Sequence, residues 1–279
     1  MTDQPVSAAP AGGIGPRVLA LANQKGGVGK TTTAINLGTA LAAIGETVLV
    51  IDLDPQGNAS TGLGIERSRR RLSTYDVLNG DVPLRDVLLE TDVPALHVAP
   101  STLDLSGLEL QIAQERDRAF RLRKAVRTLA SDGRSPRFTY VLVDCPPSLS
   151  LITVNAMAAA HAIVVPLQCE FFALEGLSQL LKTVEQVRGA LNPELSIHGI
   201  VLTMYDARNN LSDQVVEDVR QFMGDKVYKT VIPRNVRVSE APSYGKPVLL
   251  YDLKCAGSQA YLRLASEVIQ RERAARETV

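Results

Sequence analysis

A glycine-rich segment between two lysines constrains this chain more than any other feature of its sequence. It follows the apolar run Val18–Asn23, precedes a helical pattern, and consists of Lys25, Gly26, Gly27, Val28, Gly29, Lys30, Thr31 and Thr32. A glycine-rich turn lets backbone N–H groups surround phosphate oxygens, and a following helix N-terminus adds partial positive charge. Lys30 can then reach the β- and γ-phosphates, and the Thr31 hydroxyl can ligate Mg²⁺. The segment therefore predicts a nucleotide-phosphate site.

Apolar runs alternate with longer helical patterns along the chain. The expected strands are Val18–Asn23, Thr47–Ile51, Leu96–Ala99, Tyr140–Val143, Ala162–Val165, Ile197–Met204 and Val227–Ile232. Most are continuous runs of Val, Ile, Leu and Ala, as in parallel strands that are covered on both faces. We expect an α/β fold with one doubly wound, mostly parallel sheet and helices on both faces. Residues 17–279 would form this domain, after a flexible arm at residues 1–16 that contains three prolines and three glycines.

Composition excludes several classes of protein. The 279 residues include 30 basic and 30 acidic side chains, so a uniformly basic DNA-binding protein is excluded, although a local basic face is not. The three cysteines lack CxxC spacing, which gives no zinc signal and favours a reducing cytoplasm. No apolar stretch approaches the roughly eighteen residues that would span a bilayer.

Three aspartates follow predicted strands. Asp52 and Asp54 come after the second strand, and Asp144 ends the strand Tyr140–Val143. The loops after parallel strands share one edge of the sheet, so we expect these carboxylates near the glycine-rich loop. Alternation along an extended chain would put Asp52 and Asp54 on the same side. Since Mg²⁺ needs only a few protein oxygens besides water, Thr31 with Asp54 and Asp144, through water, suffices.

The first lysine of the loop sets it apart from an ordinary phosphate loop. Gln24 stands where the usual pattern has its first glycine, and Lys25 follows directly. This variant resembles the deviant Walker A motif of the MinD/ParA/NifH group of P-loop ATPases. The resemblance implies that Lys25 contacts ATP across a dimer interface and that Lys30 contacts it within its own subunit. The active form would then be an ATP-sandwich homodimer.

Other segments resemble the ParA branch of this group. The string Asp54-Pro55-Gln56-Gly57-Asn58 is similar to its switch I, which implies that Asp54 acts in hydrolysis. Asp144 would be the Walker B acid, and Asp52 would support the magnesium shell or the local fold. The guanine-reading string Asn-Lys-x-Asp is absent, and the resemblance places the adenine base near Met204 and Pro233.

The segment from Tyr228 to Pro242 narrows the resemblance to chromosomal, Soj-type ParA partition ATPases. This resemblance implies that the protein uses ATP and Mg²⁺ as cofactors and binds double-stranded DNA without sequence preference. It also implies a ParB-like partner that stimulates hydrolysis, and a cytoplasmic, nucleoid-associated location. Slow basal turnover is expected because no arginine finger is evident. The resemblance selects Arg208 and Arg237 for DNA binding, with the clusters Arg67–Arg71 and Arg116–Arg127 as rival sites.

Four other kinds of protein share parts of this pattern. The runner-up is a ParA-like ATPase that positions a protein cargo instead of DNA. An iron–sulfur reductase of the same group would use cysteines, but Cys145 and Cys169 are expected to be small residues at strand ends. A membrane-bound relative would end in an amphipathic helix, whereas the tail Tyr261–Val279 has mixed charge, so no membrane partner is expected. A metabolic phosphotransferase would need a second-substrate signature, and none is visible.

Overall fold

The predicted strands lie in one eight-stranded sheet in the computed structural model, which describes residues 15–277. The strands are β1 (Arg17–Leu21), β2 (Val48–Asp52), β3 (Leu89–Glu90), β4 (Leu96–Ala99), β5 (Tyr140–Asp144), β6 (Ala162–Gln168), β7 (Ser196–Tyr205) and β8 (Val227–Pro233). Their order in the sheet is β3-β4-β2-β5-β1-β6-β7-β8. The pair β3–β4 is antiparallel and the other neighbouring pairs are parallel. The predicted fold class is confirmed.

Differences from the predicted elements are small and have local causes. Strand β6 continues to Gln168, because Pro166 and Leu167 still pair with β7. The short edge strand β3 was not predicted, since two residues are too few to show a period. The predicted arm at residues 1–16 lies outside the described residues except for Gly15 and Pro16, so it stays a prediction.

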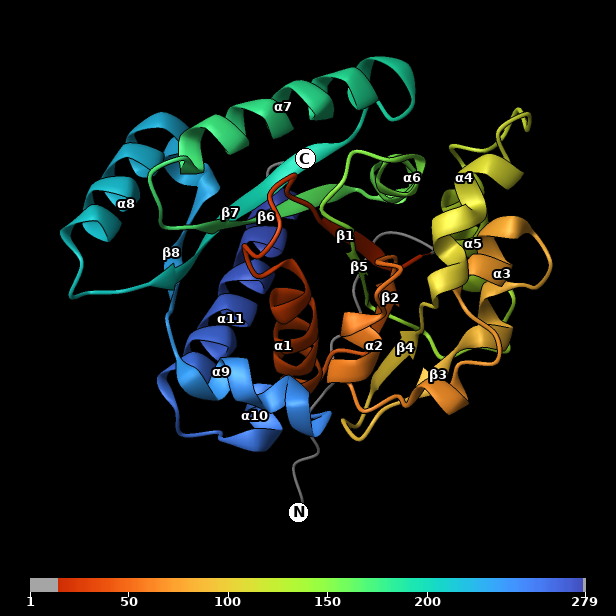
Figure 1. The fold of residues 1–279 in the computed structure, drawn as a ribbon, viewed down its shortest axis with the longest axis horizontal. Coiled ribbons are helices and arrows are strands. Elements are labelled where there is room, and N and C mark those ends of the chain that lie inside the picture. Colours follow the sequence, from red (N-terminus) through yellow and green to blue (C-terminus); the bar gives the residue numbers. More distant parts are fainter. Residues whose placement is uncertain (1–14, 278–279) are drawn as a thin grey trace.

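Helices cover both faces of the sheet (Figure 1). They are α1 (Lys30–Ala43), α2 (Asn58–Gly62), α3 (Thr74–Asn79), α4 (Leu108–Gln111), α5 (Arg121–Ser131), α6 (Leu151–Ala159), α7 (Ala173–Ala190), α8 (Asn210–Met223), α9 (Val236–Glu240), α10 (Val248–Tyr251) and α11 (Ala256–Glu277). Side chains of α1, α2, α10 and α11 share one apolar core with the sheet, and those of α3 and α5 to α8 share the other. Burial of apolar side chains on both faces explains the continuous apolar strands.

Helix α1 links the glycine-rich loop to the core. Its side chains from Thr33 to Leu41 are buried, whereas Ile44 ends the helix and is 43% exposed. Asn36 fixes the helix, because its Nδ2 donates to the Thr32 carbonyl and its Oδ1 accepts from the Val248 amide, at 2.8 Å each.

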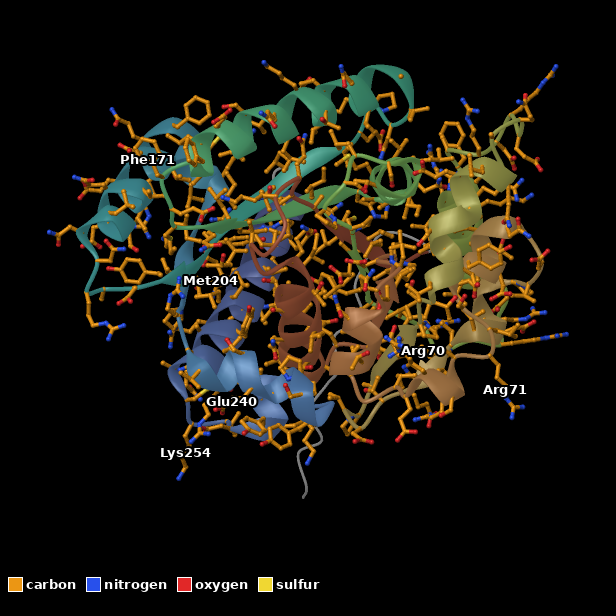
Figure 2. The ribbon with its side chains drawn as sticks, viewed as in Figure 1. Arg70, Arg71, Phe171, Met204, Glu240 and Lys254 are labelled. Atoms are coloured by element: carbon orange, nitrogen blue, oxygen red, sulfur yellow. The ribbon has the colours of Figure 1, made fainter. Side chains whose placement is uncertain are left out.

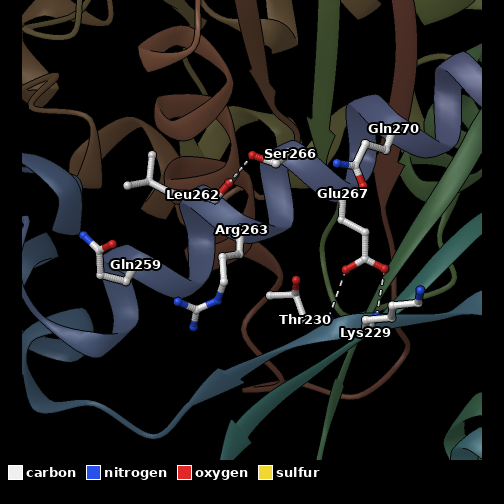
Figure 3. A pocket seen from close by; sticks show the side chains of 8 residues that line it. All are labelled: Lys229, Thr230, Gln259, Leu262, Arg263, Ser266, Glu267 and Gln270. Atoms are coloured by element: carbon white, nitrogen blue, oxygen red, sulfur yellow. Dashed lines mark hydrogen bonds between the residues drawn. The ribbon is translucent and has the colours of Figure 1, made fainter.

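Strand β8 forms the far edge of the sheet and departs from regular pairing. Ile200 pairs with Val227 and Leu202 with Val231, so β8 carries extra residues between these pairs. The freed amides of Lys229 and Thr230 donate to the Glu267 carboxylate on α11, at 2.8 and 2.9 Å, beside a shallow pocket (Figure 3). An unpaired strand edge invites association with other chains, and Glu267 satisfies part of this edge internally.

The C-terminal helix α11 is partly buried rather than free in solvent. Glu272 is 6% exposed and accepts from Arg17 Nε at 2.8 Å, with His198 Nε2 at 2.9 Å. The mixed charge that the sequence shows in this tail therefore includes a structural ion pair. No helix within residues 15–277 is long and apolar enough to cross a membrane.

The fold predicts a strong size limit at Gly199. This glycine lies under the fully buried ring of Tyr228, and an added Cβ would lie 2.6 Å from Cε2 of that ring. Gly199→Ala should lower the free energy of unfolding in urea by about 1–3 kcal/mol, because the fully buried ring would have to shift to make room for the methyl group. Gly189→Ala is the matched control, since nothing lies within 4 Å of its added Cβ on α7. The control should retain or raise stability. Equal stability of the two variants would contradict the described packing of β7 on β8.

Candidate functional site

The glycine-rich loop curls over the end of β1 and is tied down from both sides. Asn23 is buried, donates through Nδ2 to the Pro166 carbonyl at 2.8 Å, and accepts at Oδ1 from the Lys25 amide at 3.1 Å. Across the loop, Thr203 Oγ1 donates to the Val28 carbonyl at 2.8 Å. Gly29 has φ +89° and starts α1, a conformation that favours glycine. The loop therefore has the fixed shape that a phosphate site requires.

Lys30 lies inside this loop. It is 6% exposed, and its Nζ donates to the Lys25 carbonyl at 2.9 Å. Burial lowers the pKa of its ammonium group from the usual value, whereas Asp144, Cys145 and Asp54 act in the opposite direction. A buried cation with a single backbone partner is available to phosphate oxygens at the same place.

Lys25 has the opposite environment. Its side chain is 42% exposed, and its Nζ forms an ion pair with Glu170 in the loop between β6 and α7. The sequence placed residues 166–170 at the same edge of the sheet but did not indicate this pairing. The residue after Glu170 is Phe171, which is 74% exposed (Figure 2), and it lies edge to face with Phe172, which is 60% exposed. Lys25 therefore lies at the protein surface, as a contact with another molecule would require.

Asp144 ends β5 directly opposite Asp52 on β2 and Leu21 on β1. It is fully buried, and neither of its carboxylate oxygens has a hydrogen-bond partner. Burial raises the pKa of its carboxyl well above the usual value, Asp52 raises it further, and Thr31 and Lys30 act in the opposite direction. The Thr31 hydroxyl is near enough to favour the charged form, but neither oxygen accepts a well-formed hydrogen bond, and a bound cation would relieve this costly arrangement.

This edge fits magnesium as P-loop proteins bind it. Within the described part of the chain, no three acidic, His or Cys side chains form a metal cage. Mg²⁺ in phosphate sites keeps several waters and needs few protein oxygens. The unpartnered oxygens of Asp144, with Thr31 at the start of α1, match that donor set.

Asp52 has a structural environment. It is fully buried, and its Oδ2 accepts from the Ser60 amide and hydroxyl at 2.8 and 2.6 Å. Its Oδ1 accepts from the Asp54 amide at 3.1 Å. Burial raises the pKa of Asp52 to about 6, against the lowering effect of the Ser60 hydrogen bonds. Of the two roles considered for Asp52, these contacts favour support of the local fold.

Asp54 does not continue the strand, which corrects the expectation of an extended chain. Strand β2 ends at Asp52, and Asp54 begins a turn in which its carbonyl accepts from the Gly57 amide at 2.9 Å. The half-buried Asp54 carboxylate accepts from the Gln56 amide at 3.0 Å. Asp52 is therefore placed by the strand, and Asp54 is placed by a turn and not by strand alternation.

The two segments expected near an adenine base lie side by side at the ends of β7 and β8. Tyr205 pairs with Pro233, and its carbonyl accepts from the Arg234 amide at 2.8 Å. Met204 has φ +52°, and its Cε lies 4.0 Å from a Cβ added to Gly29 (Figure 2). A non-glycine residue in the left-handed region is a strained position of the kind that gathers at binding sites.

The candidate DNA-binding arginines are exposed and paired with acids. Arg208 forms a two-pronged contact with Asp206, at 2.9 and 2.8 Å, and lowers the pKa of that carboxyl to about 2. Arg237 lies 3.0 Å from Glu240 and 3.6 Å from Asp252. Exposed ion pairs contribute little, so phosphate groups could replace these partners at small cost.

The rival clusters offer fewer free cations than the sequence indicates. Arg70 is buried, so Arg67–Arg71 is not one continuous basic surface. Helix α5 begins only at Arg121, so the cluster Arg116–Arg127 does not lie on one continuous helix. Arg121 itself is 13% exposed and lies 2.9 Å from Glu115.

The sequence is similar to known proteins over most of its length. Residues 16–197 match the model of a family described as an AAA domain. The chain is 67% identical over 257 residues to the chromosome partitioning protein ParA of Caulobacter vibrioides strain NA1000, covering 92% of this chain and 95% of that protein. It is 48% identical over 256 residues to the chromosome-partitioning ATPase Soj of Treponema pallidum, covering 92% and 98%.

A solved structure has the same fold and an occupied site. The cobyrinic acid a,c-diamide synthase of Mycobacterium smegmatis, solved with an ATP analogue and magnesium, is 36% identical with a TM-score of 0.81. The match covers 93% of this chain and 97% of that one. Its fold agrees with the sheet and loop described above, and the sequence identities to ParA and Soj are higher. The chain therefore belongs to the ParA/Soj family of chromosome-partitioning P-loop ATPases.

Proposed function

We propose that this protein is a chromosome-partitioning ATPase that binds ATP and Mg²⁺, forms an ATP-sandwich homodimer and binds double-stranded DNA without sequence preference. A ParB-like partner would stimulate its slow basal hydrolysis, and it would act in the cytoplasm on the nucleoid. The observation that carries the proposal is the burial of two opposite charges, Lys30 and Asp144, at the phosphate loop, with no hydrogen bond accepted by either Asp144 oxygen. Family membership supports partitioning as the biological role.

Each residue has a task that its environment supports. Lys30 and the loop amides hold the phosphates, while Thr31 and Asp144 hold Mg²⁺, directly or through water. The metal, when bound, neutralises charge that develops on the phosphates. Asp54 orients the attacking water, because its turn places a half-buried carboxylate at the same edge. Such sites act chiefly by positioning and charge stabilisation.

Lys25 is the proposed contact between subunits. Its exposed side chain pairs with Glu170 in the single chain, and in the dimer it would leave this partner for the nucleotide of the other subunit. Exchange of an exposed ion pair for a phosphate contact is favourable, since charge-assisted contacts to phosphate are strong.

DNA is the cargo that the relatives favour over a protein cluster. The ParA relative, which is 67% identical, and the Soj relative, which is 48% identical, are both named for chromosome partitioning. A dimer would double the surface that contains Arg208 and Arg237, and phosphate contacts need charge more than base-specific geometry. A ParA-like ATPase for a protein cargo stays the alternative.

The two lysines should have separable effects. Lys30→Ala should abolish ATP binding in calorimetry, because it removes the buried cation at the phosphates. Lys25→Ala should bind ATP and remain monomeric by light scattering. Glu170→Gln is the matched control, since it removes the partner of Lys25 but keeps the lysine, and it should still dimerise. Normal dimerisation of Lys25→Ala would refute the sandwich arrangement.

Substitution of Asp54 should affect hydrolysis, whereas substitution of Asp52 should affect stability. Asp54→Ala should bind ATP and dimerise but lose hydrolysis, with little change in stability. Asp52→Ala should lower the free energy of unfolding by about 1–3 kcal/mol, because Ser60 loses a buried acceptor. Steady-state hydrolysis and urea unfolding of both variants measure these effects. Wild-type turnover by Asp54→Ala would move the hydrolytic role to another carboxylate.

DNA affinity should depend on salt and not on sequence. If the dimer contacts about four phosphates, raising salt from about 50 to about 200 mM should weaken binding roughly a hundredfold. Arg208→Glu and Arg237→Glu should remove DNA binding and keep ATP-dependent dimerisation, whereas Arg71→Glu should have a smaller effect. Fluorescence anisotropy on two unrelated duplexes measures the affinity and its salt dependence for the wild type and each variant. Unchanged affinity and salt slope in both variants would place the DNA-binding surface elsewhere.

A further inference from the structure

Arg70 differs from the other arginines in its stretch of sequence. It is 7% exposed, whereas Arg67, Arg69 and Arg71 are exposed. Figure 2 shows Arg70 close to α2, whereas the Arg71 side chain projects outward from the molecule. Burial of a guanidinium is costly unless its donors are satisfied, so the contacts of Arg70 require an explanation.

The hydrogen bonds of the Arg70 side chain go to Gly57 at the end of the Asp54 turn, to the segment 61–65 that follows, and to the loop after β4. Nη1 donates to the carbonyls of Gly57 at 3.2 Å and Ser101 at 3.4 Å. Nη2 donates to Thr61 Oγ1 at 2.7 Å and to the Ile65 carbonyl at 2.6 Å, and Nε donates to the same carbonyl at 3.2 Å. The planar guanidinium thus connects four points of backbone and side chain in one fixed geometry.

Gly57 connects this guanidinium to Asp54. Its amide donates to the Asp54 carbonyl at 2.9 Å and closes the turn, and its φ of +64° starts α2. Its carbonyl accepts from Arg70 and also from Thr61 Oγ1, at 3.0 Å. A Cβ on Gly57 would collide with Arg70 Nη1, so the turn and the guanidinium are fitted to each other.

Asp52 holds the same segment from the other side. It accepts from the Asp54 amide and from Ser60, and the Ser60 hydroxyl accepts from the Ser101 amide at 3.1 Å. Arg70 reaches the Ser101 carbonyl, so the two buried charged groups are connected through Ser60 and Ser101. The turn that carries Asp54 is therefore fixed at both ends by buried charged side chains.

We propose that Arg70 is a positioning residue for ATP hydrolysis: it fixes the turn Asp54–Gly57 so that the Asp54 carboxylate is oriented toward the reacting water. The proposal rests on the proposed hydrolytic role of Asp54. Arg70 contacts no residue of the phosphate loop through these hydrogen bonds, so its effect should fall on turnover and not on nucleotide binding.

The test compares Arg70→Met with Arg71→Met in steady-state ATP hydrolysis by the full chain. Arg70→Met should lower kcat about ten- to a hundredfold, the size of effect that misplacement of a reacting group produces, and leave KM for ATP unchanged. Arg70→Lys should recover only part of kcat, because one ammonium cannot reach all four acceptors. Arg71→Met should match the wild type. A folded Arg70→Met variant with wild-type kcat, or with kcat and KM changed together, would overturn the proposal.

A second variant covers the case in which Arg70→Met does not fold. Thr61→Val removes one acceptor of the guanidinium and keeps Arg70 in place. It should lower kcat several-fold with KM unchanged, and wild-type kcat would overturn the proposal. Asp54→Ala in the same assay separates the two claims. If Asp54→Ala retains turnover, the hydrolytic assignment fails; if it is inactive while both test variants have wild-type kcat, only the positioning role fails.

Discussion

The site depends on charges of opposite sign that the fold removes from water at one edge of the sheet. Lys30 and Asp144 are both buried, and the carboxylate has no hydrogen-bond donor of its own. Such an arrangement is costly without ligands and becomes favourable when phosphates and a cation complete it. The parallel sheet makes this possible, because β1, β2 and β5 end side by side. The glycine-rich loop after β1, the Asp54 turn after β2 and Asp144 at the end of β5 therefore lie at one edge.

Much of the fold and of the phosphate loop could be predicted from the sequence, because both depend on patterns within short stretches of the chain. Continuous apolar runs predicted seven strands, and the glycine-rich loop predicted where β1 meets α1. The resemblance to the ParA group is confirmed by the relatives. It placed Met204 and Pro233 near the base, and the structure brings their segments together at the ends of β7 and β8.

Features that depend on long-range contacts were beyond the sequence. Nothing in the run Arg67–Arg71 distinguishes Arg70, because its burial follows from acceptors that the fold supplies at Gly57 and Ser101. The Lys25–Glu170 ion pair joins loops that are distant in the chain. Alternation misplaced Asp54, since the strand ends at Asp52 and a proline-containing turn takes over. Tertiary contacts decided the first two cases, whereas a local turn decided the position of Asp54.

In the function proposed above, ATP held by this site would switch the protein to a DNA-binding dimer. The most direct measurement is DNA binding by the purified full chain without nucleotide, with ADP and with ATP, on one duplex at one salt concentration. We expect tight binding with ATP and weak binding in the other two states. Equal DNA affinity in all three states would contradict the nucleotide switch, and no DNA binding with ATP would favour a protein cargo.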